Sequence, residues 1–128
     1  MGLRNPNVRS IMIIEDEDDV LQVYKEYLER KGYVVEASAP TANDAVKDYE
    51  TYKPDVTLMD YRLPGYMNGL EAAEKILRIN PSATILMVTA FESIKDELER
   101  NPFLSDKKIF VVRKPVRMAN LVKTISNL

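Results

Sequence analysis

The sequence contains no cysteine and no histidine, and each absence removes a class of chemistry. Without cysteine there are no disulfides, no thiolate nucleophile and no cysteine-based zinc site. Without histidine there is no histidine-based catalytic triad, no imidazole base or metal ligand, and no phosphohistidine on this chain. Any chemistry must therefore use carboxylates, lysine, hydroxyl groups or a hard metal ion held by oxygen ligands.

Long apolar runs and a large charge excess are also missing. No segment is apolar over the length that a membrane-spanning helix needs, and the first residues carry no signal-peptide pattern. The net charge of -2 argues against a nucleic-acid or membrane-surface role. With 128 residues, 45% of them hydrophobic, the sequence predicts one soluble, cytoplasmic domain over 1–128, with its core at about 8–127.

Apolar runs alternate with amphipathic segments along the whole chain, which predicts alternating strands and helices. Regular alternation at this length indicates an α/β fold, a three-layer α/β/α sandwich around a doubly wound five-stranded parallel sheet, (βα)5. The predicted strands are 8–14, 33–37, 55–59, 83–88 and 109–112. Helices are predicted from about 20 to a stop at 31–32, from a cap at Thr41 or Asn43 to about 52, from a cap at Asn68 to a stop at 80–81, over 91–100 and over 116–126.

Acidic residues stand at the ends of two predicted strands. Glu15 and Asp16 follow the first strand, and Asp60 follows the third, just before a Pro-Gly loop. Right-handed crossovers place the C-terminal ends of parallel strands at one edge, so these carboxylates are expected to converge. Mg2+ or Mn2+, which prefer oxygen ligands, would relieve their mutual repulsion. An acidic helix N-terminus explains part of the run 15–19 without any metal, chiefly 17–19.

Thr89 ends the fourth predicted strand, and Lys114 ends the fifth. Alone, Thr89 would be interpreted as a helix N-cap and Lys114 as a solvated charge. Opposite a carboxylate at the same edge, however, a hydroxyl and an ammonium can supply the charge-assisted hydrogen bonds that a bound phosphoryl group requires. The strand ends therefore predict a divalent-cation site that contains a nucleophile.

In this order, the motifs resemble the receiver domain of two-component response regulators, of the chemotaxis-regulator kind, over about 8–127. The resemblance rests on the acidic pair 15–16, the aspartate at 60 with its Pro-Gly loop, Thr-Ala at 89–90 and Lys-Pro at 114–115. It implies a flavodoxin-like fold and a Lys-Pro bond that is commonly cis, which proline permits.

The resemblance also implies a function. Asp60 would accept a phosphoryl group from a sensor histidine kinase or phosphotransfer protein, assisted by Lys114 and Thr89. Mg2+ (or Mn2+) would be bound by three carboxylates and one backbone carbonyl: those of Glu15, Asp16 and Asp60, and that of Arg62. Such a chain is a signalling phosphoacceptor that assists its own phosphorylation and dephosphorylation, rather than an enzyme.

Conformational switching would then signal to an output domain or a downstream protein. The sequence leaves open whether the chain is a stand-alone receiver or a piece of a longer protein. It is expected to be a monomer or weak homodimer, without direct nucleic-acid or membrane contact.

Several features depart from the usual receiver pattern. The acidic pair is Glu-Asp, so Glu15 is expected to reach the metal through water. The loop 64–69 is one residue longer than usual, and the region 100–107 is also extended. Most members carry Tyr or Phe as a switch where Val111 stands, and Phe110 should face the other way. In this family, hydrolysis depends on the two positions at which Arg62 and Phe91 stand here, and the resemblance therefore predicts a long-lived phosphorylated form because the apolar Phe91 ring cannot hold a water.

Two other functions remain as alternatives. A metal-dependent phosphohydrolase with an aspartyl nucleophile would need an acid two residues after Asp60, where Arg62 stands. A receiver-like interaction module that is not phosphorylated would usually have lost the acids or the lysine, and this chain retains them all.

Overall fold

The computed structural model describes residues 10–128, apart from the side chain of Ala37. Residues 8 and 9, where the first strand was predicted to begin, lie outside the described part. No helix in the described part combines the length and the apolar character that crossing a bilayer requires.

A five-stranded parallel sheet forms the centre of the molecule, with the strand order β2-β1-β3-β4-β5. The order reverses direction next to β1, which makes the sheet doubly wound and confirms the predicted fold class. The strands are β1 (Ser10–Ile14), β2 (Val34–Ala39), β3 (Val56–Asp60), β4 (Thr84–Thr89) and β5 (Lys108–Arg113).

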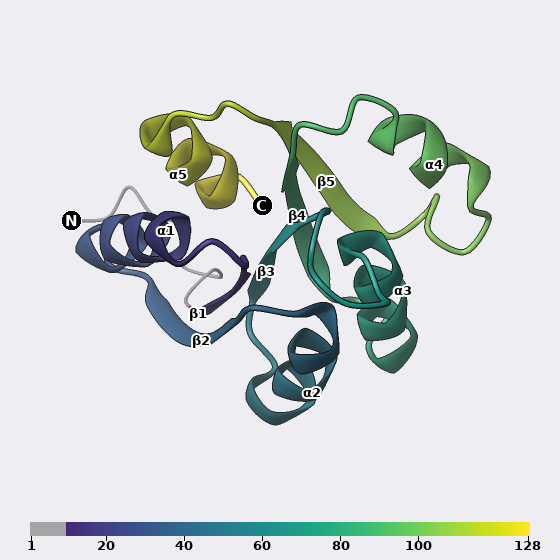
Figure 1. Ribbon diagram of the computed structural model, residues 1–128, viewed down its shortest axis with the longest axis horizontal. Coiled ribbons are helices and arrows are strands. Elements are labelled where there is room, and N and C mark those ends of the chain that lie inside the picture. The colour runs from purple at the N-terminus through teal and green to yellow at the C-terminus, as the bar shows by residue number, and fades with distance from the viewer. Residues whose placement is uncertain (1–9) are drawn as a thin grey trace.

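Helices cover both faces of this sheet. Helices α1 and α5 lie on one face, and α2, α3 and α4 lie on the other (Figure 1). The helices are α1 (Asp18–Arg30), α2 (Ala42–Tyr52), α3 (Gly69–Ile79), α4 (Ile94–Arg100) and α5 (Met118–Ser126).

Burial on both faces explains why the strands are apolar without alternation. In β1, Ile11 and Ile13 pack in the core beneath α1 and α5. Met12 and Ile14, the intervening residues, pack in the core beneath α2 and α3. All four side chains are at most 1% exposed.

Local signals in the sequence set several helix ends. The Thr41 side chain accepts a hydrogen bond from the Asp44 amide and caps α2. Asn68 forms a full capping box with Glu71 at the start of α3. Gly32 follows α1 with φ +96, a left-handed conformation that glycine adopts without steric cost.

Two predicted helix starts were wrong. The fourth helix begins at Ile94 rather than at 91, because the Phe91 amide donates to the Thr89 hydroxyl and holds a turn before the helix. The fifth begins at Met118 rather than at 116, because Arg117 keeps an extended conformation with ψ 139. The second strand runs to Ala39, two residues beyond the predicted end, since it pairs with β1 as far as Ile14.

Candidate phosphoryl and metal site

The strand register brings the predicted acids to one edge of the sheet. Ile14 of β1 pairs with Met59 of β3, so Glu15 follows β1 at the level of Asp60. Asp60 in turn pairs with Val88 of β4. The pairing of the neighbouring strands β1 and β3 therefore brings Glu15 and Asp60 next to each other.

Lys114 reaches the same place from β5. Its backbone N–H donates to the Thr89 carbonyl over 2.9 Å, which continues the pairing of β4 and β5 by one residue. Its ammonium Nζ lies 3.5 Å from Asp60 Oδ2 and 3.7 Å from Glu15 Oε1. The Lys114–Pro115 peptide bond is cis, as the resemblance implied.

Glu15, Asp16 and Asp60 form a compact group of carboxylates. One oxygen of each lies within 4.8 Å of the others. The Glu15 side chain is 2% exposed and that of Asp60 11%, whereas Asp16 is exposed to solvent. Glu15 Oε2 accepts a hydrogen bond from the Glu17 amide, while the buried Oε1 has no hydrogen-bond partner among the described residues.

The electrostatics of the group show a shortage of positive charge. Burial raises the pKa of Asp60 above its ordinary value of 3.8, although the Lys114 ammonium and the Arg62 amide act in the other direction. Burial is also the main cause of the raised pKa of Glu15, and repulsion from Asp60 adds to it. Burial lowers the pKa of Lys114, but attraction to the two carboxylates outweighs this, and the result lies above 10.5.

These residues fit a divalent cation. When ionised, the three carboxylates of the group face one ammonium, which leaves two negative charges uncompensated. All the side-chain donors are carboxylate oxygens, the ligand type that Mg2+ and Mn2+ prefer. The buried Glu15 Oε1, without a hydrogen-bond partner, is a further sign that the cluster has unused capacity to bind a cation.

A pocket of about 240 Å³ opens beside these carboxylates. The Thr89 hydroxyl, which accepts from the Phe91 amide over 3.1 Å, still has its own proton to donate into this space. The lining residues are Asp16, Glu17, Asp60, Arg62, Thr89, Ala90 and Lys114. An acid, a hydroxyl and an ammonium thus line one small volume, as the sequence predicted.

Arg62 contributes to the pocket in a way that the sequence did not indicate. Its backbone N–H lies 3.4 Å from Asp60 Oδ1 and donates to it. The role predicted for the Arg62 carbonyl, that of a metal ligand, stays a prediction.

The loop between β3 and α3 closes tightly on the end of β3, and the sequence analysis missed this. The Gly69 N–H donates to the Tyr61 carbonyl over 2.8 Å. A Cβ at Gly69 would collide with the Asp60 carbonyl oxygen and lie 2.9 Å from Tyr61 Cα. Only glycine therefore lets α3 start this close to the Asp60 backbone. The available signal was a glycine directly after the Asn68 cap.

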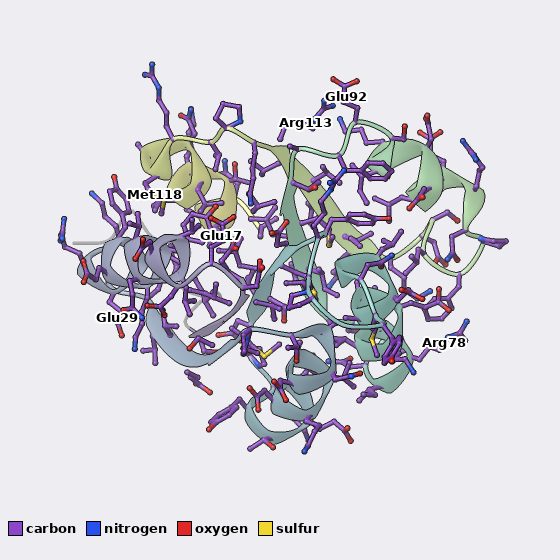
Figure 2. All side chains as sticks on the ribbon, viewed as in Figure 1. Glu17, Glu29, Arg78, Glu92, Arg113 and Met118 are labelled. Carbon is purple, nitrogen blue, oxygen red and sulfur yellow. The ribbon has the colours of Figure 1, made fainter. Side chains whose placement is uncertain are left out.

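An aromatic pair next to the pocket was also missed. The rings of Tyr61 and Phe91 stack, with centroids 4.7 Å apart and an angle of 17° between their planes. Phe91 is not among the residues that line the pocket, so its role in shielding the site from water stays a prediction. In the same region of the chain, Glu92 and Arg113 form an exposed ion pair with a distance of 3.7 Å (Figure 2).

The switch position on β5 matches the sequence analysis. Val111 packs against the core beneath α3 and α4. Phe110 is 43% exposed and belongs to neither core cluster of the described residues. The two adjacent side chains therefore face different surroundings, and β5 offers no aromatic ring toward α4.

Comparison with known proteins identifies the family. The response regulator receiver domain matches residues 11–126. The chain therefore belongs to the receiver domain family of two-component response regulators.

Individual relatives agree with this assignment. A chemotaxis protein CheY from Thermotoga maritima is 28% identical over 118 residues, which cover 92% of this chain and 95% of the relative. A CheY-like receiver domain from Methanospirillum hungatei has a TM-score of 0.80 at 29% identity, covering 94% of this chain and 92% of that structure. A protein-glutamate methylesterase from Paramagnetospirillum magneticum is 32% identical over 86% of this chain, but the match spans only 31% of that larger protein.

A more distant structure shows the fold alone. It is a CheX-CheY-BeF3-Mg complex from Borrelia burgdorferi, with a TM-score of 0.81 at 16% identity, covering 93% of this chain and 87% of that chain.

Proposed function

We propose that this receiver domain accepts a phosphoryl group on Asp60 in a Mg2+-dependent reaction and signals through the resulting change of conformation. The observation that carries the proposal is the position of the Lys114 ammonium, 3.5 Å from Asp60 and 3.7 Å from Glu15, beside a pocket that also contains Thr89. A carboxylate, a hydroxyl and an ammonium line the space in which the phosphoryl group would be bound.

The phosphohistidine donor would lie outside these 128 residues, because they include no histidine. In the proposed reaction, an Asp60 carboxylate oxygen attacks the phosphorus of a phosphohistidine on a sensor kinase or phosphotransfer protein. A new P–O bond forms while the P–N bond breaks, and its electron pair remains on the imidazole nitrogen of the donor. The product is an acyl phosphate on Asp60.

Lys114 and Thr89 have distinct tasks in this reaction. The Lys114 ammonium already contacts Asp60 Oδ2 and would pair with the phosphoryl oxygens as they arrive. The Thr89 hydroxyl would donate its free proton to another phosphoryl oxygen. The Arg62 amide, which donates to Oδ1, would help hold the carboxylate in one orientation.

Glu15, Asp16 and Asp60 would hold the metal ion. When bound, Mg2+ would supply positive charge that screens the nucleophile from the incoming phosphoryl group. Glu15 is fixed by the Glu17 amide and buried, whereas Asp16 is exposed and can approach an ion directly. We therefore assign direct coordination to Asp16 and Asp60, and contact through water to Glu15.

The experiment is to incubate the chain with acetyl phosphate and Mg2+ and then measure its intact mass. Wild type should gain one phosphoryl group, and addition of a chelator should prevent it. Asp60→Asn should gain none, while Asp55→Asn serves as a matched control, since Asp55 contacts Ser10 away from the pocket. Phosphorylation of the Asp60→Asn variant, or phosphorylation of wild type to the same extent with and without the chelator, would rule out the proposal.

A further inference from the structure

Tyr61 links the phosphoacceptor to three neighbouring elements. It directly follows Asp60 at the end of β3, and its side chain is half-buried against the core beneath α3 and α4. Its ring stacks on that of Phe91, from the segment between β4 and α4, at 4.7 Å. Its hydroxyl accepts a hydrogen bond from Asn68 Nδ2, 3.5 Å away at the cap of α3. Burial, with the nearby negative charge of Glu97 on α4, raises the pKa of this hydroxyl.

Phe91 links this ring pair to the threonine of the site. The Phe91 amide donates to the Thr89 hydroxyl over 3.1 Å. A movement of the Thr89 hydroxyl toward a phosphoryl group on Asp60 would therefore pull on the Phe91 backbone. The Tyr61 ring would have to move with the Phe91 segment, because the two rings are in stacking contact with centroids 4.7 Å apart.

Helix α4 follows Phe91 in the chain and is the shortest of the described helices. It has seven residues, its N-cap Ser93 makes no side-chain cap bond, and its buried residues are Ile94 and Leu98. A helix with so few fixed contacts can change position at small energetic cost. Because β5 has Val111 at the position that faces the core beneath α4, no ring on that strand can connect the site to the helix.

We propose that Tyr61, stacked on Phe91 in the segment that leads into α4, transmits the state of Asp60 to α4. The inference rests on the proposed phosphorylation of Asp60 and adds the residues that carry its consequence. Tyr61 acts here as a positioning residue, which alters α4 without taking part in phosphoryl transfer.

The test compares backbone amide NMR shifts in α4 before and after treatment with acetyl phosphate and Mg2+, with intact mass measured on the same samples. In wild type, the amides of Ile94–Arg100 should shift on phosphorylation. In Tyr61→Phe, which loses the hydroxyl, and in Glu97→Gln, which loses the charge near it, these shifts should fall below the wild-type values. In Tyr61→Leu, which also loses the ring stack, they should fall further.

Two controls separate transmission from damage to the site. Phe110→Leu alters an aromatic side chain that is exposed on β5 and should leave the α4 response complete. The phosphorylated fraction in each Tyr61 variant should equal that of wild type, as should the shifts of Thr89 and Ala90 beside the pocket. Full α4 shifts in Tyr61→Leu would overturn the inference while leaving the proposed function intact. If the mass of wild type does not increase, both the proposed phosphorylation and the role of Tyr61 are wrong. Intact mass detects this outcome independently of the NMR shifts.

Discussion

Replacing Asp60 by asparagine should make the metal-free protein more stable. The change removes a negative charge and keeps the size of the side chain and one acceptor oxygen for the Arg62 amide. Asp60 is 11% exposed, so most of its carboxylate is removed from water in the folded state. Burial is also the main reason that its pKa is raised.

The distances give the size of the competing charge effects. At an effective dielectric constant of about 20, attraction to the Lys114 ammonium at 3.5 Å is worth about 5 kcal/mol. Repulsion from the buried Glu15, with oxygens within 4.8 Å, costs about 3.5 kcal/mol on the same basis. Asp16 is exposed, and its repulsion in a water-like medium adds about 1 kcal/mol. Attraction and repulsion nearly cancel, so the cost of burying the carboxylate decides the sign.

We therefore expect Asp60→Asn to increase the free energy of unfolding by about 1–2 kcal/mol without metal, or about 4–8 °C in melting temperature. Thermal and urea unfolding in the presence of a chelator measure this. The response to metal should reverse the ranking: Mg2+ at ten times its Kd should stabilise wild type by about 1.4 kcal/mol and leave Asp60→Asn nearly unchanged. If Asp60→Asn were less stable than wild type in the presence of the chelator, the conclusion that burial of the Asp60 carboxylate destabilises the metal-free protein would be wrong.

The same reasoning predicts an unusual dependence on pH. The pKa values of Asp60 and Glu15 lie above their ordinary values of 3.8 and 4.5, so the folded state binds more protons than the unfolded state between the ordinary and the raised values. The contribution of these two groups to stability should therefore rise as the pH falls from 7 through their raised pKa values toward the ordinary ones. The difference between wild type and Asp60→Asn isolates this contribution, and it should shrink on acidification. A difference that grows as the pH falls would contradict the direction of the shifts.

Three further outcomes are expected. Asp16→Ala should abolish Mg2+ binding in a calorimetric titration, whereas Glu15→Asp should largely retain it; equal affinity in Asp16→Ala and wild type would disprove the ligand assignment. Gly69→Ala should destabilise the chain by about 2 kcal/mol or more and slow phosphorylation, because the added Cβ would collide with the Asp60 carbonyl oxygen. A normal phosphorylation rate would show that the loop can rearrange to avoid this collision. Phe91→Glu should shorten the lifetime of the phosphorylated form, since a carboxylate can hold an attacking water where the ring cannot; decay at the wild-type rate would remove Phe91 from the control of hydrolysis.

The sequence was sufficient to predict the sheet, the helices and the edge where the acids meet. The strand patterns are local signals, and right-handed crossovers then place Glu15, Asp60 and Lys114 at the same edge of one sheet. The structure adds the distances, which show that the Lys114 ammonium approaches both the Glu15 and the Asp60 carboxylates.

Other features could not be predicted because they depend on contacts between distant loops. The stacking of Tyr61 on Phe91 joins residues from different connections and produces no periodic pattern. The late start of α4 depends on one hydrogen bond from Phe91 to Thr89. The requirement for glycine at position 69 becomes visible only once α3 lies against the Asp60 carbonyl.

The most direct test of the central claim is to locate the phosphoryl group. After treatment with acetyl phosphate and Mg2+, reduction of the acyl phosphate with borohydride converts the modified aspartate into homoserine, and peptide mass spectrometry locates it. We expect homoserine at position 60, dependent on Mg2+ and absent when the chelator is added first. Homoserine at Asp16 or another acidic residue, with Asp60 unmodified, would contradict it.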